Sequence, residues 1–86
     1  MHTVDLLAHA LNLAERLGYE IRRDWLGGTG GGHCEIKGRK VFFLDLALSA
    51  TDQLEQILAA LRHEPRALTL PMAHPLSDLL QVRKSA

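Results

Sequence analysis

Five glycines within six residues, Gly27-Gly28-Thr29-Gly30-Gly31-Gly32, divide this chain into two parts. Glycine loses the most backbone entropy on ordering, so a helix or strand does not run through such a segment. The residues before it, Tyr19 to Leu26, begin with apolar and charged side chains in alternation, which is the period of a β-strand. After it, His33 to Lys37 and Lys40 to Asp45 have the same strand character. We therefore predict a strand, a glycine loop and a β-hairpin, in that order.

The hairpin sequence also predicts a turn and an inner face. Gly38-Arg39 suits a two-residue type II′ turn, which takes glycine first. Cys34 and Ile36 alternate with charged residues, so we expect the cysteine to face the core. The continuous apolar run from residue 41 to residue 44 is typical of a central strand that is covered on both faces. The other face of the sheet is expected to be polar and to carry Arg22, Glu35, Lys37 and Lys40.

Two helices are predicted from apolar side chains at helical spacing. Residues 4–17 place leucines, alanines and a valine on one broad stripe, with Thr3 as N-cap and Gly18 as the glycine that follows the helix. The second helix runs from Ser49, which suits an N-cap, to Arg62. The stripe on the first helix is wide, so either two surfaces cover it or part of it contacts a partner.

The remaining residues complete the predicted fold. Residues 64–86 contain all three prolines, which predicts an extended loop, and Pro75 suits the first turn of a short last helix. The order is helix, three antiparallel strands, helix, loop and short helix. This is the α+β class, with helices on one face of a small sheet. A length of 86 residues allows one domain, residues 1–86, on which the C-terminal segment packs.

Charge and cysteine content argue against several classes of function. Ten Lys and Arg balance ten Asp and Glu, which argues against a nucleic-acid binder that neutralises phosphates. A single cysteine excludes an internal disulfide. Charged residues interrupt the N-terminal apolar run, which has the pattern of neither a signal peptide nor a membrane span. We expect a soluble cytoplasmic protein without a membrane partner, and the neutral net charge favours self-association. Five basic residues nevertheless gather around the sheet: Arg22, Arg23, Lys37, Arg39 and Lys40.

The glycine loop invites comparison with phosphate-binding loops, because backbone N–H groups can cradle anions. A P-loop ends in Gly-Lys-Ser/Thr, whereas this run ends in Gly32-His33-Cys34. No G-x-G-x-x-G register fits either, and a strand rather than a helix is expected to follow. The favoured interpretation is a flexible connection, or a close approach of the backbone to another surface. We therefore expect no cofactor.

His33-Cys34-Glu35 contains three potential metal ligands in a row. Alternation along a strand places Cys34 on the face opposite to the other two. A closed zinc site needs about four ligands, so His63, Glu64 and His74 would have to complete it. A metal or small-ligand site formed by Cys34, His33, His63 and Glu64 is the alternative function. The simpler interpretation is an inert buried thiol beside surface histidines.

Residues 17–61 resemble the N-terminal part of ImmA/IrrE-like metallopeptidase domains: a strand after a first helix, the hairpin from His33 to Asp45, and a helix that starts at Ser49. They are also similar to short bacterial proteins with a Gly-Gly-x-Cys segment before such a hairpin. In the peptidases the helix after the hairpin carries the zinc motif H-E-x-x-H, whereas residues 52–61 contain no histidine. The resemblance implies the scaffold without its chemistry, as in a regulatory or interaction module, and carries over no catalytic residue.

Trp25, at the start of the glycine loop, is the strongest single candidate for a binding surface, since tryptophan is among the side chains most enriched in interface hot spots. It is equally a common core anchor in small domains, and both interpretations stay open. The predicted binding residues are Trp25, Gly28, Gly30, Gly31, Gly32, His33 and Cys34. The sequence thus predicts a non-enzymatic protein–protein interaction or accessory module that is homodimeric, or that binds another protein.

Overall fold

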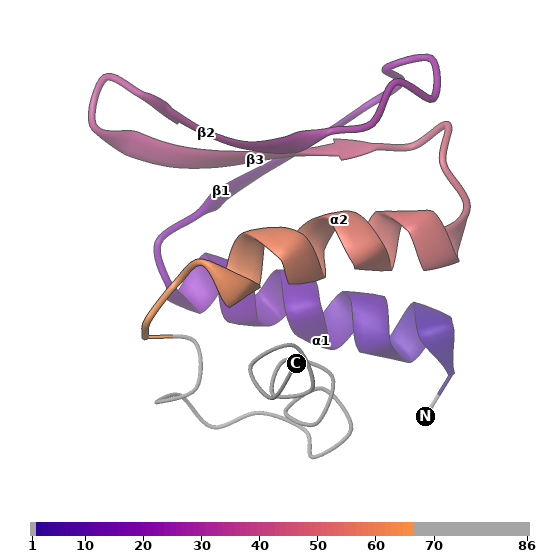
Figure 1. The fold of residues 1–86 in the computed structure, drawn as a ribbon, viewed down its shortest axis with the longest axis horizontal. Coiled ribbons are helices and arrows are strands. Elements are labelled where there is room, and N and C mark those ends of the chain that lie inside the picture. The colour runs from indigo at the N-terminus through magenta and orange to yellow at the C-terminus, as the bar shows by residue number, and fades with distance from the viewer. Residues whose placement is uncertain (1, 67–86) are drawn as a thin grey trace.

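The computed structural model describes residues 2–66; the part of the predicted C-terminal loop and short helix after residue 66 lies outside the described residues. The elements are α1 (Thr3–Arg16), β1 (Glu20–Asp24), β2 (Gly32–Ile36), β3 (Arg39–Asp45) and α2 (Ala50–Arg62). Both helices lie side by side on the same face of the sheet (Figure 1). The predicted α+β class and the order of these elements are therefore confirmed.

The sheet is mixed, and the prediction of three antiparallel strands is wrong. Its strand order is β1-β3-β2, with β2 antiparallel and β1 parallel to β3. The strands alternate in direction along the chain, as in a meander, but the glycine loop carries β2 past β3 to the far edge. β3 therefore lies next to β1 and runs parallel to it. Side chains alternate in the same way in both kinds of pair, so the sequence pattern did not distinguish them.

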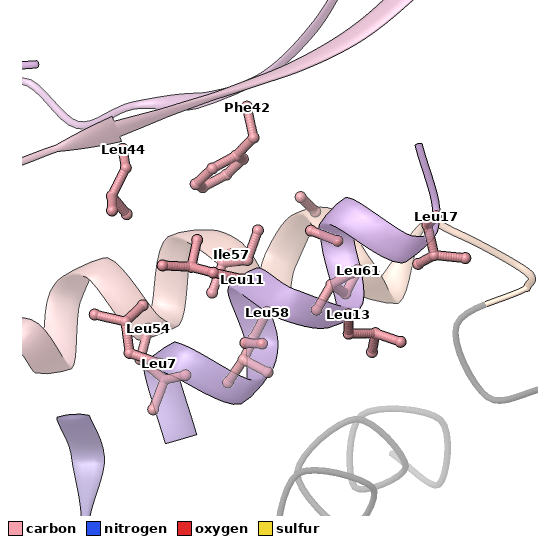
Figure 2. Packing of buried hydrophobic residues seen from close by; sticks show 13 residues of the cluster. Leu7, Leu11, Leu13, Leu17, Phe42, Leu44, Leu54, Ile57, Leu58 and Leu61 are labelled. Carbon is pink, nitrogen blue, oxygen red and sulfur yellow. The ribbon is translucent and has the colours of Figure 1, made fainter. Parts of the chain in front are cut away.

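The core lies between the sheet and the helix pair. Phe42 and Leu44 point from β3 towards the helices and meet leucines of both (Figure 2). Burying one such side chain stabilises the fold by about 1.5–3 kcal/mol. The central strand and both helices therefore contribute to one common cluster. The buried helix residues are Leu7, Ala10, Leu11, Leu13 and Ala14 on α1, and Leu54, Ile57, Leu58, Ala60 and Leu61 on α2.

The predicted start of α2 and the predicted end of α1 are observed, whereas the predicted N-cap of α1 is not. The Ser49 hydroxyl accepts a hydrogen bond from the Asp52 N–H (3.2 Å), which confirms it as the N-cap of α2. After α1, the N–H of Tyr19 donates to the carbonyl of Ala14 (3.0 Å) across a glycine with φ +98°, which is a Schellman ending. Thr3 is the first helical residue rather than the N-cap of α1.

The face of the sheet away from α1 and α2, hereafter the open face, carries Cys34. This residue lies opposite Val41, whereas His33 lies opposite Phe42, which points at the helices. The prediction that Cys34 faces the core is therefore wrong. The apolar run of β3 supplies both faces, so the alternation along β2 did not reveal which face the helices cover. Glu35 lies opposite Lys40 across the two strands, and both are on the face that the helices cover. The prediction that these two residues lie on the face away from the helices is therefore wrong. The side chains of the open face include Arg22, Cys34, Ile36, Val41 and Phe43.

The hairpin turn consists of Lys37 and Gly38, one residue earlier than predicted. Ile36 pairs with Arg39, and the two residues between them have φ values of +51° and +78°. Positive φ at both positions is the signature of a type I′ turn, not of type II′. Lys37 therefore has a left-handed backbone, which a side chain with a Cβ atom disfavours.

Lys37→Asn is expected to stabilise the protein. Asparagine tolerates the left-handed region better than lysine, and Asn-Gly is a preferred type I′ pair, so the free energy of unfolding should rise by on the order of 1 kcal/mol. Urea unfolding followed by circular dichroism measures the change. The matched variant Lys37→Val should be less stable than the natural protein. An asparagine variant that unfolds at lower urea than the natural protein would contradict this account of the turn.

Candidate functional site

In the structure, the glycine loop consists of residues 25–31, because the last glycine of the run, Gly32, begins β2. This loop connects β1 to β2 and is held by one buried carboxylate. Asp45, the last residue of β3, is only 1% exposed. Its Oδ1 accepts hydrogen bonds from the backbone N–H groups of Leu26 (3.0 Å) and Ala47 (2.9 Å). Its Oδ2 accepts one from the N–H of Gly30 (3.1 Å). This carboxylate therefore ties both the start and the end of the loop to the central strand.

The same backbone donors determine the charge state of Asp45. Burial, the largest single influence, favours the neutral acid and raises the pKa of the carboxyl group. The backbone donors favour the carboxylate, and together they outweigh burial and lower the pKa of Asp45 below its ordinary value. Asp45 is thus a buried anion at neutral pH. The donors are the N–H groups of Ala47, Leu26, Gly30 and Gly28.

The loop is an anion-binding turn whose anion comes from the chain itself. Positive φ values at Gly28 (+79°) and Gly30 (+86°) allow it to fold around the Asp45 carboxylate. The N–H groups of Leu26, Gly28 and Gly30 are therefore already engaged by Asp45 rather than available to a phosphate. Of the two interpretations of the loop, the close backbone approach is the one observed. Gly31 packs so tightly on β3 that a Cβ atom there would overlap the carbonyl oxygen of Phe43.

A hollow of ≈ 420 Å³ lies on the open face, between the glycine loop, β2 and β3. Its lining is glycine backbone and mainly apolar side chains, which suits an aliphatic group rather than a charged ligand. Five of the seven predicted binding residues take part in it. The lining residues are Leu26, Gly30, Gly31, Gly32, His33, Cys34 and Phe43.

The other two predicted binding residues, Trp25 and Gly28, lie outside this lining. Trp25 is 72% exposed, and its backbone N–H donates to Oδ1 of Asp24 (2.8 Å). Its interpretation as a core anchor is therefore wrong, and its exposure favours a contact role. Gly28 serves the loop instead, as a donor to Asp45.

Three contributors to this region were missed by the sequence analysis: Asp45, Leu26 and Phe43. An acidic residue at the end of an apolar strand is expected to be buried, and a buried carboxylate needs hydrogen-bond donors around it. That signal was present at Asp45. Leu26 and Phe43 carried no local signal, because their place beside the hollow follows from the strand order.

The structure does not bring together the four ligands of the alternative metal site. Cys34 lies on the open face, and the neighbouring His33 points to the opposite side. His63 and Glu64 follow α2, which lies across the sheet from the open face that carries Cys34 (Figure 1). Within residues 2–66, no three His, Cys, Asp or Glu side chains are grouped so that they could hold a metal ion.

A polar cluster that the sequence did not suggest joins β3 to the end of α2. Nζ of Lys40 lies 2.7 Å from Oε2 of Glu64 and 5.4 Å from the centroid of the Tyr19 ring. The shared hydrogen bond lowers the pKa of Glu64 and raises that of Lys40, while partial burial raises the pKa of Tyr19. Arg22 instead pairs with Glu20 on the open face. The basic residues around the sheet are therefore divided between two faces.

Comparison of the chain with protein-family models, curated proteins and solved structures gives no significant match. Neither α1 nor α2 has the length and apolar composition that crossing a membrane requires. The glycine loop and the open face are therefore the features of this chain that bear on its function.

Asp45→Asn is expected to lower the melting temperature at neutral pH, because a neutral amide replaces the anion that the backbone donors surround. The folded-state pKa of Asp45 is lowered, so its stabilisation is complete above the ordinary carboxyl value of 3.8 and is lost as pH falls through the folded-state pKa. The gap in melting temperature between the natural protein and the variant should therefore narrow below about pH 4. Thermal unfolding at a series of pH values measures this gap.

Glu55→Gln, at an exposed position on α2, is the matched control for the loss of a carboxylate. Its melting temperature at neutral pH should stay close to that of the natural protein. A difference in melting temperature between the natural protein and Asp45→Asn that stays constant as the pH falls would contradict a role for the charge of Asp45.

Gly31→Ala should destabilise the protein more than Gly28→Ala. The methyl group at position 31 meets a backbone oxygen that cannot move aside, and such overpacking costs about 3 kcal/mol. At position 28 the space is open, so only the positive φ is strained, at about 1–2 kcal/mol. Urea unfolding of both variants gives the comparison. Equal stability, or the reverse order, would contradict the close packing of the loop on β3.

Proposed function

We propose that this chain is a non-enzymatic protein–protein interaction module that acts as a homodimer. One observation carries the proposal: the helices cover one face of the sheet, while Ile36 is exposed and Cys34 and Phe43 are partly accessible on the open face. Ile36 is 41% exposed there, and the half-buried Cys34 borders the hollow beside the glycine loop. Exposed apolar side chains next to an apolar hollow are typical of a protein contact surface.

A second copy of the chain is the partner that these features favour. Ten basic and ten acidic residues leave no net charge, so two copies do not repel each other at long range. A chain of 86 residues buries a smaller share of its surface than a larger domain does, so burial between copies adds stability. Trp25, which follows β1, is also exposed and is a further apolar side chain that a partner could contact.

The positions of the reactive side chains support a non-enzymatic role. Asp45 is surrounded by backbone donors and is not free to act as a base. Cys34 and His33 point to opposite faces, so this histidine cannot activate the thiol. The resemblance of residues 17–61 to peptidase domains, without their zinc motif, favours the same role. We further infer a cytoplasmic location, which suits a single free thiol.

Sedimentation velocity at micromolar concentration tests the proposal. The natural chain should sediment as a dimer that dissociates on dilution. Ile36→Lys should shift the equilibrium towards monomer, because it places a charge on the apolar contact surface. The control is Val4→Lys on α1, which alters a residue of 65% exposure away from the open face and should leave the dimer intact. A natural chain that stays monomeric at micromolar concentration would contradict the proposal.

A further inference from the structure

The two edges of the sheet differ in their protection against pairing with another strand. β1 has a charged side chain at four of its five positions, whereas β2 has one, Glu35. Charged residues on an edge strand discourage pairing with a second chain. Among the described residues each of these strands pairs with β3 alone. The outer edge of β2 is therefore the unprotected edge of this sheet.

We infer that two copies of the chain pair through their β2 strands, antiparallel and centred on Cys34, so that one continuous sheet spans both copies. This inference rests on the proposed homodimer and specifies its contact. A twofold axis perpendicular to the sheet at Cys34 places that residue opposite its own copy. It also places His33 of each copy opposite Glu35 of the other, and Gly32 opposite Ile36.

The charges of β2 favour a twofold axis at Cys34 over one at Glu35 or at His33. Centred on Cys34, each exposed Glu35 faces an imidazole, whose ring N–H can donate to the carboxylate. A centre at Glu35 would place two carboxylates directly opposite each other, which destabilises a strand pair. A centre at His33 would oppose two imidazoles and would leave Ile36 beyond the end of the paired strand. Only the centre at Cys34 pairs all five residues of β2.

The hollow on the open face fits the same arrangement. Gly32 lies between Phe43 on β3 and the position that Ile36 of the second copy would take. Because Gly32 has no side chain, that isoleucine can extend over it towards the hollow lined by Leu26 and Phe43. Pairing through β2 thus covers the exposed Ile36 and places an apolar side chain at the hollow in one step, twice in each dimer.

The geometry of Cys34 separates this dimer from a stack of two open faces. Directly opposite residues in an antiparallel pair have Cα atoms about 4.5–5.5 Å apart, which is within the range that a disulfide bridges. Two sheets packed face to face lie about 10 Å apart, beyond that range. Cys34 is the only cysteine of the chain, so the natural sequence reports on its own contact.

The experiment treats the natural chain with diamide, which oxidises two thiols to a disulfide. We expect a covalent dimer that forms about a thousandfold faster than in urea-unfolded chain, because pairing raises the effective thiol concentration from micromolar to millimolar. Formation of this dimer at the same rate in the folded and unfolded chain would overturn the inference.

Two variants in a Cys34→Ser background set the register. His33→Cys mixed with Glu35→Cys should give a covalent heterodimer, since these positions lie opposite each other. Each variant alone should react far more slowly, because its two thiols are offset by two residues along the strands. Both positions are exposed, so the fold should tolerate the changes. Equal reaction of the separate and mixed variants would overturn the register.

Different results would contradict the homodimer and its contact through β2. A chain that sediments as a dimer but forms no Cys34 disulfide would overturn pairing through β2 and leave the homodimer standing. A chain that sediments as a monomer would overturn both. A dimer that is cross-linked at Cys34, with the mixed variants reacting preferentially, would support both.

Discussion

The carboxylate of Asp45 is the constraint on which the arrangement of this sheet depends. A loop that crosses from one edge strand to the other must leave the sheet and return, and the backbone donors that it turns towards the protein must find acceptors there. Asp45 supplies those acceptors at the end of the central strand. The loop is thereby held at the end of β3, and β2 comes to lie on the far side of that strand from β1.

Strand order then determines what each face offers. With β3 in the centre, Phe42 and Leu44 meet the helices, and Val41 and Phe43 lie on the open face. The register turns Cys34 to that same open face, next to a hollow that glycine backbone shapes. The proposed contact surface is therefore a consequence of how the loop is anchored, and no reactive group is needed to explain it.

Local patterns in the sequence were sufficient for the elements and insufficient for their arrangement. Helical periodicity and the cap at Ser49 act over a few residues, so the helices were predicted nearly to their ends. Alternation in the strands is independent of neighbour and direction, so it revealed neither the parallel pair nor the face of Cys34. Five of the predicted binding residues line the hollow because they adjoin in sequence, whereas Asp45 acts on the loop from a distant position.

Hydrogen exchange of single amides, measured by NMR on the natural chain and on Asp45→Asn, tests the anchoring of the loop most directly. The amides of Leu26 and Gly30 donate to the carboxylate, so they should be protected in the natural chain despite their place in a glycine-rich loop. In the variant they should lose that protection, while the amide of Leu58 in the core of α2 keeps it. Exchange of the Gly30 amide at the rate of an unfolded peptide in the natural chain would contradict the account.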